Sequence, residues 1–280
     1  MGRPKKLKVL FMGKNKEKVT LALDYLLEEC SSFIKVEGVA GPNYGLLKDH
    51  AVKEGLKFYT NKDLYNNPIE NLDLAVSFLY PQLIKEPYIS SPTLGCINFH
   101  PAPLPKYRGV ANYARAILNG ETEFGVSAHY VDNTFDTGDI IEVRMLPIDP
   151  RETSYSLEKK SLRLLEDLFE DTFTLMNISA GKELPRVPQD SLSSNIVPIY
   201  TKISDIDKLR TVDLNDTAEE INVKIRAFWF PPMGGARLIL AGEEFTLINQ
   251  DLLNVINRWK NIANSYDEED PDGDGVKLYL

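Results

Sequence analysis

The chain has 280 residues, of which 43% are hydrophobic and 26% are charged, a composition typical of soluble globular proteins. The formal net charge of −9 argues against a broad basic surface for binding nucleic acid. The two cysteines, Cys30 and Cys96, fit no metal motif and no disulfide framework, so we expect no bound metal and a reducing compartment.

The amino-terminal residues, MGRPKKLKVLF, combine a basic stretch with only a short apolar run, which does not match a signal peptide. No apolar run elsewhere in the sequence approaches the 18 or more residues that a membrane span needs. We therefore expect a cytoplasmic protein without membrane contact.

Short apolar runs alternate with longer amphipathic ones over the first 118 residues. The apolar runs predict strands at 9–12, 33–40, 56–59, 72–79 and 94–99. Helical spacing of apolar residues predicts helices at 16–29, 45–54 and 110–118. This alternation indicates an α/β fold, Rossmann-like, with a mostly parallel sheet flanked by helices.

The pattern changes after residue 118. Two strand-like runs, 125–131 and 139–146, flank the polar loop DNTFDTG, and a long helix is expected at 153–180. Residues 181–203 lack strong periodicity and contain three prolines, so we place a linker there. The catalytic domain is accordingly expected at 1–200 and a small domain at 201–280.

The carboxyl-terminal region predicts a small α+β unit. Thr217 and Glu220 form a capping-box pair at the start of a helix. The runs 236–240 and 244–248 around Ala241-Gly242 predict a β-hairpin. The acidic run DEEDPDGDG contains the opening of an EF-hand pattern, but no helical pattern flanks it, so we interpret it as an acidic turn.

The densest signal in the sequence is INFHPAPLPKYRG, at residues 97–109. Asn98 and His100 lie two residues apart at the end of a predicted strand, so their side chains point to the same side. Active sites of open α/β sheets lie beyond the carboxyl ends of strands. The motif therefore fits a site, although a turn asparagine and an ordinary edge histidine would give the same two residues.

A second signal, HYVDNTFDTGDII, occupies residues 129–141. Here a predicted strand runs into a loop with three carboxylates, those of Asp132, Asp136 and Asp139, around Gly138. Taken alone, this segment also fits an ordinary acidic turn between two strands.

Together the two segments resemble the 10-formyltetrahydrofolate-dependent formyltransferases. That family carries Asn-x-His-Pro-x-x-Leu-Pro-x-x-x-Gly and, later in the chain, Asp-x-Gly. The matching residues are Asn98, His100, Pro101, Leu104, Pro105, Gly109, Asp136 and Gly138. The resemblance covers roughly residues 7–200. Within the family, the two motifs are most similar to those of the sugar N-formyltransferases, which are relatives of methionyl-tRNA formyltransferase.

The resemblance implies transfer of a formyl group from N10-formyltetrahydrofolate to a nucleotide-linked amino sugar, for surface polysaccharides such as lipopolysaccharide O-antigen. It also implies a homodimer and a cis Leu104-Pro105 bond. A methionyl-tRNA formyltransferase stays open as an alternative, but the net charge and the acidic run near the carboxyl terminus disfavour an RNA partner. A formyltetrahydrofolate hydrolase, which uses the same residues with water as acceptor, also stays open.

The resemblance further implies a role for each site residue. His100 is the expected general base, Asn98 the oxyanion donor, and Asp136 the residue that orients His100 and favours its cationic form. Folate contacts are expected from Phe78, Leu79, Tyr80, Ile84, Val131, Asp132 and Phe135. Acceptor contacts are expected from Lys14, Asn15, Tyr107 and Arg108. His129 is either a structural strand residue or part of the folate pocket.

Overall fold

The computed structural model describes residues 5–179, 184–192, 196–231 and 235–267. The chain forms two compact units. The first contains residues 1–112, 123–147 and 158–201, and the second contains 113–122, 148–157 and 202–280. The linear domain boundary after residue 200 stays a prediction.

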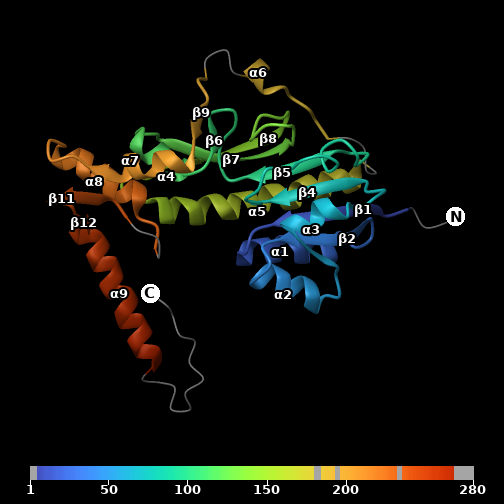
Figure 1. Cartoon of the computed structure of the whole chain (residues 1–280), viewed down its shortest axis with the longest axis horizontal. Helices are drawn as coiled ribbons and strands as arrows, with labels where there is room; N and C mark the ends of the chain where they lie inside the picture. Colours follow the sequence, from blue (N-terminus) through green and yellow to red (C-terminus); the bar gives the residue numbers. More distant parts are fainter. Residues whose placement is uncertain (1–4, 180–183, 193–195, 232–234, 268–280) are drawn as a thin grey trace. The chain divides into compact units, whose positions relative to one another are not determined.

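A seven-stranded sheet organises the first unit (Figure 1). Its order is β3-β2-β1-β4-β5-β7-β8, and the pairs from β3 to β5 are parallel, while β7 runs antiparallel to both of its neighbours. The mostly parallel α/β sheet predicted from the sequence is therefore confirmed. The strands are β1 (Leu7–Gly13), β2 (Ile34–Gly41), β3 (Phe58–Thr60), β4 (Leu74–Phe78), β5 (Cys96–His100), β7 (Glu123–Tyr130) and β8 (Ile140–Pro147).

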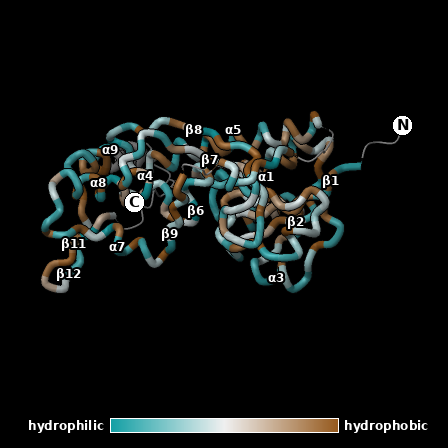
Figure 2. The backbone as a smooth tube through the Cα atoms, turned by 90° about the horizontal axis from the view of Figure 1, so that it is seen from above, coloured by the Kyte–Doolittle hydropathy of each residue, from teal (hydrophilic) through white to brown (hydrophobic). Residues whose placement is uncertain are grey.

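The central strands are buried and almost continuously apolar, as expected for parallel strands with helices on both faces. Figure 2 shows this as brown stretches along the strand β1. On one face, Phe169 of α5 packs against Phe78 of β4 and Phe99 of β5, with ring centroids 5.2 and 4.7 Å away. The helices up to residue 192 are α1 (Glu17–Leu27), α2 (Leu46–Lys53), α3 (Asn61–Asn66), α4 (Asn112–Leu118), α5 (Ser154–Ile178) and α6 (Gln189–Leu192). Of these, residues 113–118 of α4 and 154–157 of α5 belong to the second unit.

The segment that the sequence suggested as a linker contains ordered structure. Its strand β9 (Ile199–Thr201) pairs in parallel with β6 (Tyr107–Gly109), the strand that carries the end of the first motif. Both strands have three residues, which is too short for a periodic pattern to show in the sequence.

The second unit contains the predicted capping box and hairpin. The Oγ1 atom of Thr217 accepts from the Glu220 amide at 3.3 Å, and the Glu220 carboxylate accepts from the Thr217 amide at 2.7 Å. Strands β11 and β12 form the hairpin, and Ala241 and Gly242 at its turn have φ values of 51° and 87°. The elements are η1 (Ile203–Asp205), α7 (Ile206–Arg210), β10 (Thr211–Val212), α8 (Ala218–Phe228), β11 (Arg237–Leu240), β12 (Glu243–Thr246) and α9 (Gln250–Asp267).

The sequence also predicted an acidic turn near the carboxyl terminus and no membrane span. The acidic turn expected at 270–275 lies outside the described residues. Among the helices that are described, none is both long enough and apolar enough to cross a membrane.

Candidate active site

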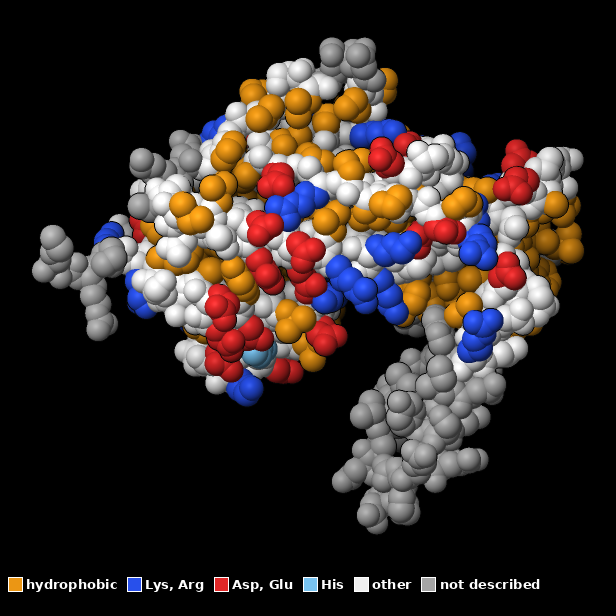
Figure 3. All heavy atoms as spheres, turned by 180° about the vertical axis from the view of Figure 1, so that it is seen from behind, with side chains coloured by type: hydrophobic (Ala, Val, Ile, Leu, Met, Phe, Trp, Pro, Cys, Tyr) orange, Lys and Arg blue, Asp and Glu red, His pale blue; other side chains and the backbone are white. Residues whose placement is uncertain are grey.

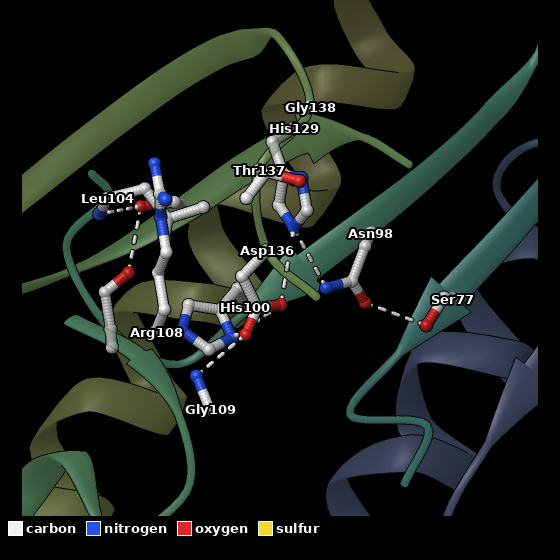
Figure 4. Close-up of polar contacts among 12 residues, drawn as sticks. Ser77, Asn98, His100, Leu104, Arg108, Gly109, His129, Asp136, Thr137 and Gly138 are labelled. Carbon is white, nitrogen blue, oxygen red and sulfur yellow. Dashed lines mark hydrogen bonds and ion pairs between the residues drawn. The ribbon is translucent and has the colours of Figure 1, made fainter. Parts of the chain in front are cut away.

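Three polar side chains form a row across the apolar sheet. In the strand register, Ser77 of β4 lies opposite Asn98 of β5, and Asn98 lies opposite His129 of β7. The Oγ atom of Ser77 is 2.7 Å from Oδ1 of Asn98, and Nδ2 of Asn98 is 3.0 Å from Nε2 of His129 (Figure 4). Pairing in register places all three side chains on one face of the sheet.

The protonation of His129 follows from its neighbours. Its Nδ1 lies 2.7 Å from the carbonyl oxygen of Tyr130, which can only accept, so Nδ1 carries the proton. Burial lowers the pKa of His129 to about 4, although the nearby Asp136 carboxylate acts in the opposite direction. His129 is therefore neutral at pH 7, and its Nε2 is a hydrogen-bond acceptor.

The orientation of the Asn98 amide is fixed as a consequence. Because Nε2 of His129 accepts, Nδ2 of Asn98 must face it, and Oδ1 must face the Ser77 hydroxyl, which donates. The second hydrogen on Nδ2 has no acceptor among the described residues. It is a held N–H donor of the kind that stabilises an oxyanion.

His100 is also held in one tautomer. Its side chain is 6% exposed, and its Nε2 donates to the carbonyl of Tyr107 at 3.0 Å. Nδ2 of Asn112 lies 3.4 Å from the same nitrogen, but both atoms are then donors, and Asn112 donates to the carbonyl of Gly109 at 3.1 Å instead. Nδ1, the nitrogen left to act as an acceptor in this tautomer, faces Asp136.

Asp136 lies between the two histidines. Its Oδ1 is 3.6 Å from Nδ1 of His100 and 3.8 Å from Nε2 of His129, both too long for hydrogen bonds. Its Oδ2 accepts from the amide of Gly109 at 2.9 Å. The carboxylate is thus anchored by the backbone and can receive a proton-bearing His100.

Steric constraints explain why glycine occupies the two motif positions 109 and 138. A Cβ at Gly138 would collide with the carbonyl of Tyr130. Gly109 has a φ of 80°, and a Cβ there would lie 2.5 Å from the carbonyl oxygen of Thr201. The Leu104-Pro105 peptide between β5 and Gly109 is cis, as predicted.

The residues predicted to contact folate lie in two different environments. Phe78 and Ile84 are buried in the core, so their side chains have little free surface, whereas Phe135 is 45% exposed. Tyr80 donates to Oδ1 of Asn61 at 2.8 Å, and the partly buried Tyr80 and Val131 pack against the hydrophobic cluster that contains Ile84. Leu79 has a φ of 58°, and Asp132 accepts from the amide of Thr134 at 3.0 Å.

The predicted acceptor contacts are not gathered in one place. Tyr107 is 1% exposed, so what it supplies to the site is its carbonyl. Lys14 and Asn15 follow β1 at the carboxyl end of the parallel strands, where β4 and β5 also end. Burial lowers the pKa of Lys14 to about 8, and Oδ1 of Asn15 is buried without a partner among the described residues.

Arg108 and Phe135, which the sequence assigned to different ligands, line the same cavity. It has a volume of about 390 Å³, and its other lining residues are Leu83, Asn133, Thr134, Thr137, Pro198 and Tyr200. Thr137 and Phe135 flank Asp136, so this cavity opens next to the loop that carries Asp136.

Sequence reasoning did not identify Ser77 or Gln189, which hold Asn98 and the Asp136 loop. Neither belongs to the motifs, and only the strand register or the folded path of the chain brings them to the site. No group of three or more potential metal-binding side chains occurs within the described ranges.

Comparison with known proteins identifies enzymes that are similar to this chain. A model of the formyl transferase family matches residues 61–170. The chain is 31% identical over 240 residues to a methionyl-tRNA formyltransferase of Dictyoglomus turgidum, over 83% of this chain and 73% of that enzyme. Across eight such enzymes, the aligned part covers from 46% to 79% of the enzyme's length.

Solved structures of sugar enzymes are similar as well. An N-formyltransferase from Helicobacter canadensis, in complex with folinic acid and dTDP-3-aminofucose, has 25% identity and a TM-score of 0.65, over 84% of this chain and 85% of that one. WlaRD, a sugar 3N-formyltransferase solved in the presence of dTDP and 5-N-formyl-THF, has 27% identity and a TM-score of 0.67, over 85% and 84%.

Proposed function

Because this chain belongs to the formyl transferase family and is an N-formyltransferase, we propose that it transfers the formyl group of N10-formyltetrahydrofolate to the amino group of a nucleotide-linked amino sugar. The observation that carries the chemistry is the arrangement of Asn98, His100 and Asp136. These three residues bring together an oriented N–H donor, an imidazole nitrogen that faces a carboxylate, and a carboxylate anchored by a backbone amide.

Under this proposal, the amine nitrogen attacks the formyl carbon and must lose a proton. Nδ1 of His100 takes that proton, and Asp136 stabilises the resulting imidazolium. The free N–H of Asn98 donates to the oxyanion that develops on the formyl oxygen. His100 then returns the proton to the departing folate nitrogen, so that the enzyme ends the cycle unchanged.

The cavity beside the catalytic loop suits the formyl donor. A volume of about 390 Å³ lies within the range of small-molecule sites, and the exposed rings of Phe135 and Tyr200 can pack on a flat ligand. The side chains of Asn133 and Thr134 add hydrogen-bonding groups to its wall. When bound, the folate supplies the activated formyl group.

We assign the acceptor to the amino-sugar class for two reasons. The Helicobacter canadensis enzyme that this chain resembles binds dTDP-3-aminofucose, and that likeness spans most of both chains. In addition, the formal net charge of −9 disfavours a polyanionic acceptor, and both basic and acidic side chains occur on the face drawn in Figure 3. The proposed contacts for phosphate and sugar groups are Lys14, Arg108 and the side-chain Oδ1 atom of Asn15.

A second candidate acceptor is methionyl-tRNA, because the Dictyoglomus turgidum enzyme is 31% identical to this chain. The test supplies the purified protein with N10-formyltetrahydrofolate and, in parallel, with a panel of nucleotide-linked amino sugars, with charged initiator tRNA, or with no acceptor. Formylation of a sugar nucleotide supports the proposal. Formylation of the tRNA alone, or formate release that needs no acceptor, refutes it and identifies the alternative activity.

A further inference from the structure

Gln189 is a buried side chain outside both sequence motifs, and it bridges two parts of the site. It is 4% exposed and begins the short helix α6. Its Nε2 lies 3.0 Å from the carbonyl oxygen of Asp136 and 2.8 Å from that of Gly138. Its Oε1 accepts from Nη2 of Arg108 at 2.7 Å. Every polar atom of this carboxamide is therefore in use.

The partners of Gln189 permit only one orientation of its amide. The guanidinium of Arg108 can only donate, and the carbonyls of Asp136 and Gly138 can only accept. Rotating the amide by 180° would set donor against donor and acceptor against acceptor at all three contacts. The side chain consequently locks the spacing between Arg108 on β6 and the loop that carries Asp136.

The path of the chain explains how Gln189 reaches this loop. Val187 forms an isolated antiparallel bridge with Ile140, with backbone hydrogen bonds of 2.8 and 2.9 Å. Ile140 is the first residue of β8, directly after the catalytic loop. Two residues beyond this bridge, Gln189 lies against the loop's carbonyls.

The loop has a conformation that needs external support. Asp136 has a φ of 58°, a left-handed conformation that residues other than glycine adopt only at a cost. Its carboxylate is anchored by the amide of Gly109, the residue next to Arg108. We infer that Gln189 is a positioning residue that fixes the backbone of residues 136–138 and so holds the Asp136 carboxylate against His100. The catalytic meaning of this inference rests on the proposed function.

Gln189→Met tests the inference, because methionine keeps the length of the side chain and removes all three hydrogen bonds. We expect kcat to fall about tenfold or more, with a much smaller change in KM. Gln189→Glu, which retains the shape and the Arg108 contact but opposes two carbonyls with a carboxylate, should lose at least as much, and it carries the test if Gln189→Met does not fold. Thr172→Val is the matched control: Thr172 is also 4% exposed and bonds only the Leu168 carbonyl within α5, so its kcat should stay unchanged.

A double-mutant cycle separates positioning from a general structural role. If Gln189 acts through Asp136, adding Gln189→Met to Asp136→Asn should lower kcat by less than about twofold further. A full tenfold loss in that background, or an unchanged kcat for Gln189→Met alone, overturns the inference.

A crystal structure of Gln189→Met gives a readout that does not depend on activity. We expect the Asp136 carboxylate to leave the Gly109 amide, and a loop that stays in place overturns the inference. If wild-type protein transfers no formyl group to any acceptor, the proposed function fails, while this structural comparison still decides whether Gln189 holds the loop.

Discussion

Replacing Ser77 by alanine should impair catalysis, although Ser77 itself is not proposed to contact either substrate. Ser77 is 1% exposed, and its hydroxyl donates to Oδ1 of Asn98 at 2.7 Å. A hydrogen bond of this kind has a net value of about 0.5–1.5 kcal/mol. If that stabilisation is lost in the transition state, kcat falls by about two- to twelvefold, since 1.4 kcal/mol corresponds to tenfold. Removing the donor itself in Asn98→Ala should cost about 10²–10³ in kcat.

The assay is steady-state formyl transfer with saturating donor and acceptor, beside a thermal melt of each variant. Ser161→Ala is the control, because Ser161 is fully buried in α5 and its Oγ has no hydrogen-bond partner among the described residues. Since Ser77 acts through Asn98, the double variant should be no slower than Asn98→Ala alone. A Ser77→Ala enzyme with wild-type kcat, or a double variant that loses a further factor of five or so, would refute the reasoning.

Three other predictions follow from the site and the family. His100→Asn should lower kcat by about 10²–10⁴, and Asp136→Asn should also strongly reduce turnover. Both variants should keep the wild-type melting temperature. A His100→Asn enzyme that retains more than about a tenth of the wild-type kcat contradicts the general-base role. Because the pKa of His129 is about 4 in the folded state against 6.5 when unfolded, the unfolded chain binds more protons between these values, so stability should fall as pH drops through this window. In His129→Gln, the melting temperature should depend less on pH between about 4 and 6.5 than it does in the wild-type protein. An equal pH dependence in the two proteins contradicts this role of His129. Light scattering at micromolar concentration should give the mass of a dimer; a monomer mass contradicts the predicted homodimer.

The sequence predicts the fold class well, because the buried parallel strands are continuous apolar runs that few other structures share. The strand expected at 72–79 is β4 at Leu74–Phe78, and the helix expected at 153–180 is α5 at Ser154–Ile178. The short elements β6, β9 and α6 are absent from the prediction, since three or four residues seldom show a period, although an apolar run did indicate the three-residue β3. The 18-residue helix α9 is absent from the prediction as well. Tertiary contacts alone make these segments regular.

The same division applies to the site. The spacing of Asn98 and His100 within one strand could be read directly, because alternation along a strand is a local rule. Ser77 is a single serine in an apolar run, and its role depends on which residue of β5 it faces. Gln189 lies 53 residues after Asp136 in sequence and becomes visible only through the bridge between Val187 and Ile140. Local patterns are therefore enough to propose the reacting groups, whereas the residues that orient them can be found only in the folded structure.

If Asn98 acts as proposed, the row formed by Ser77, Asn98 and His129 makes enzymatic activity a reporter of how the strands align. A slip of β7 by one residue against β5 would bring Ala128 or Tyr130 opposite Asn98 and turn every side chain of the strand to the other face. Such a misaligned species could keep its helix and strand content, so circular dichroism would count it as native. Specific activity per folded molecule would then measure the fraction of chains in which β7 pairs with β5 in the native register. This measure is useful when refolding yields or expression conditions are compared.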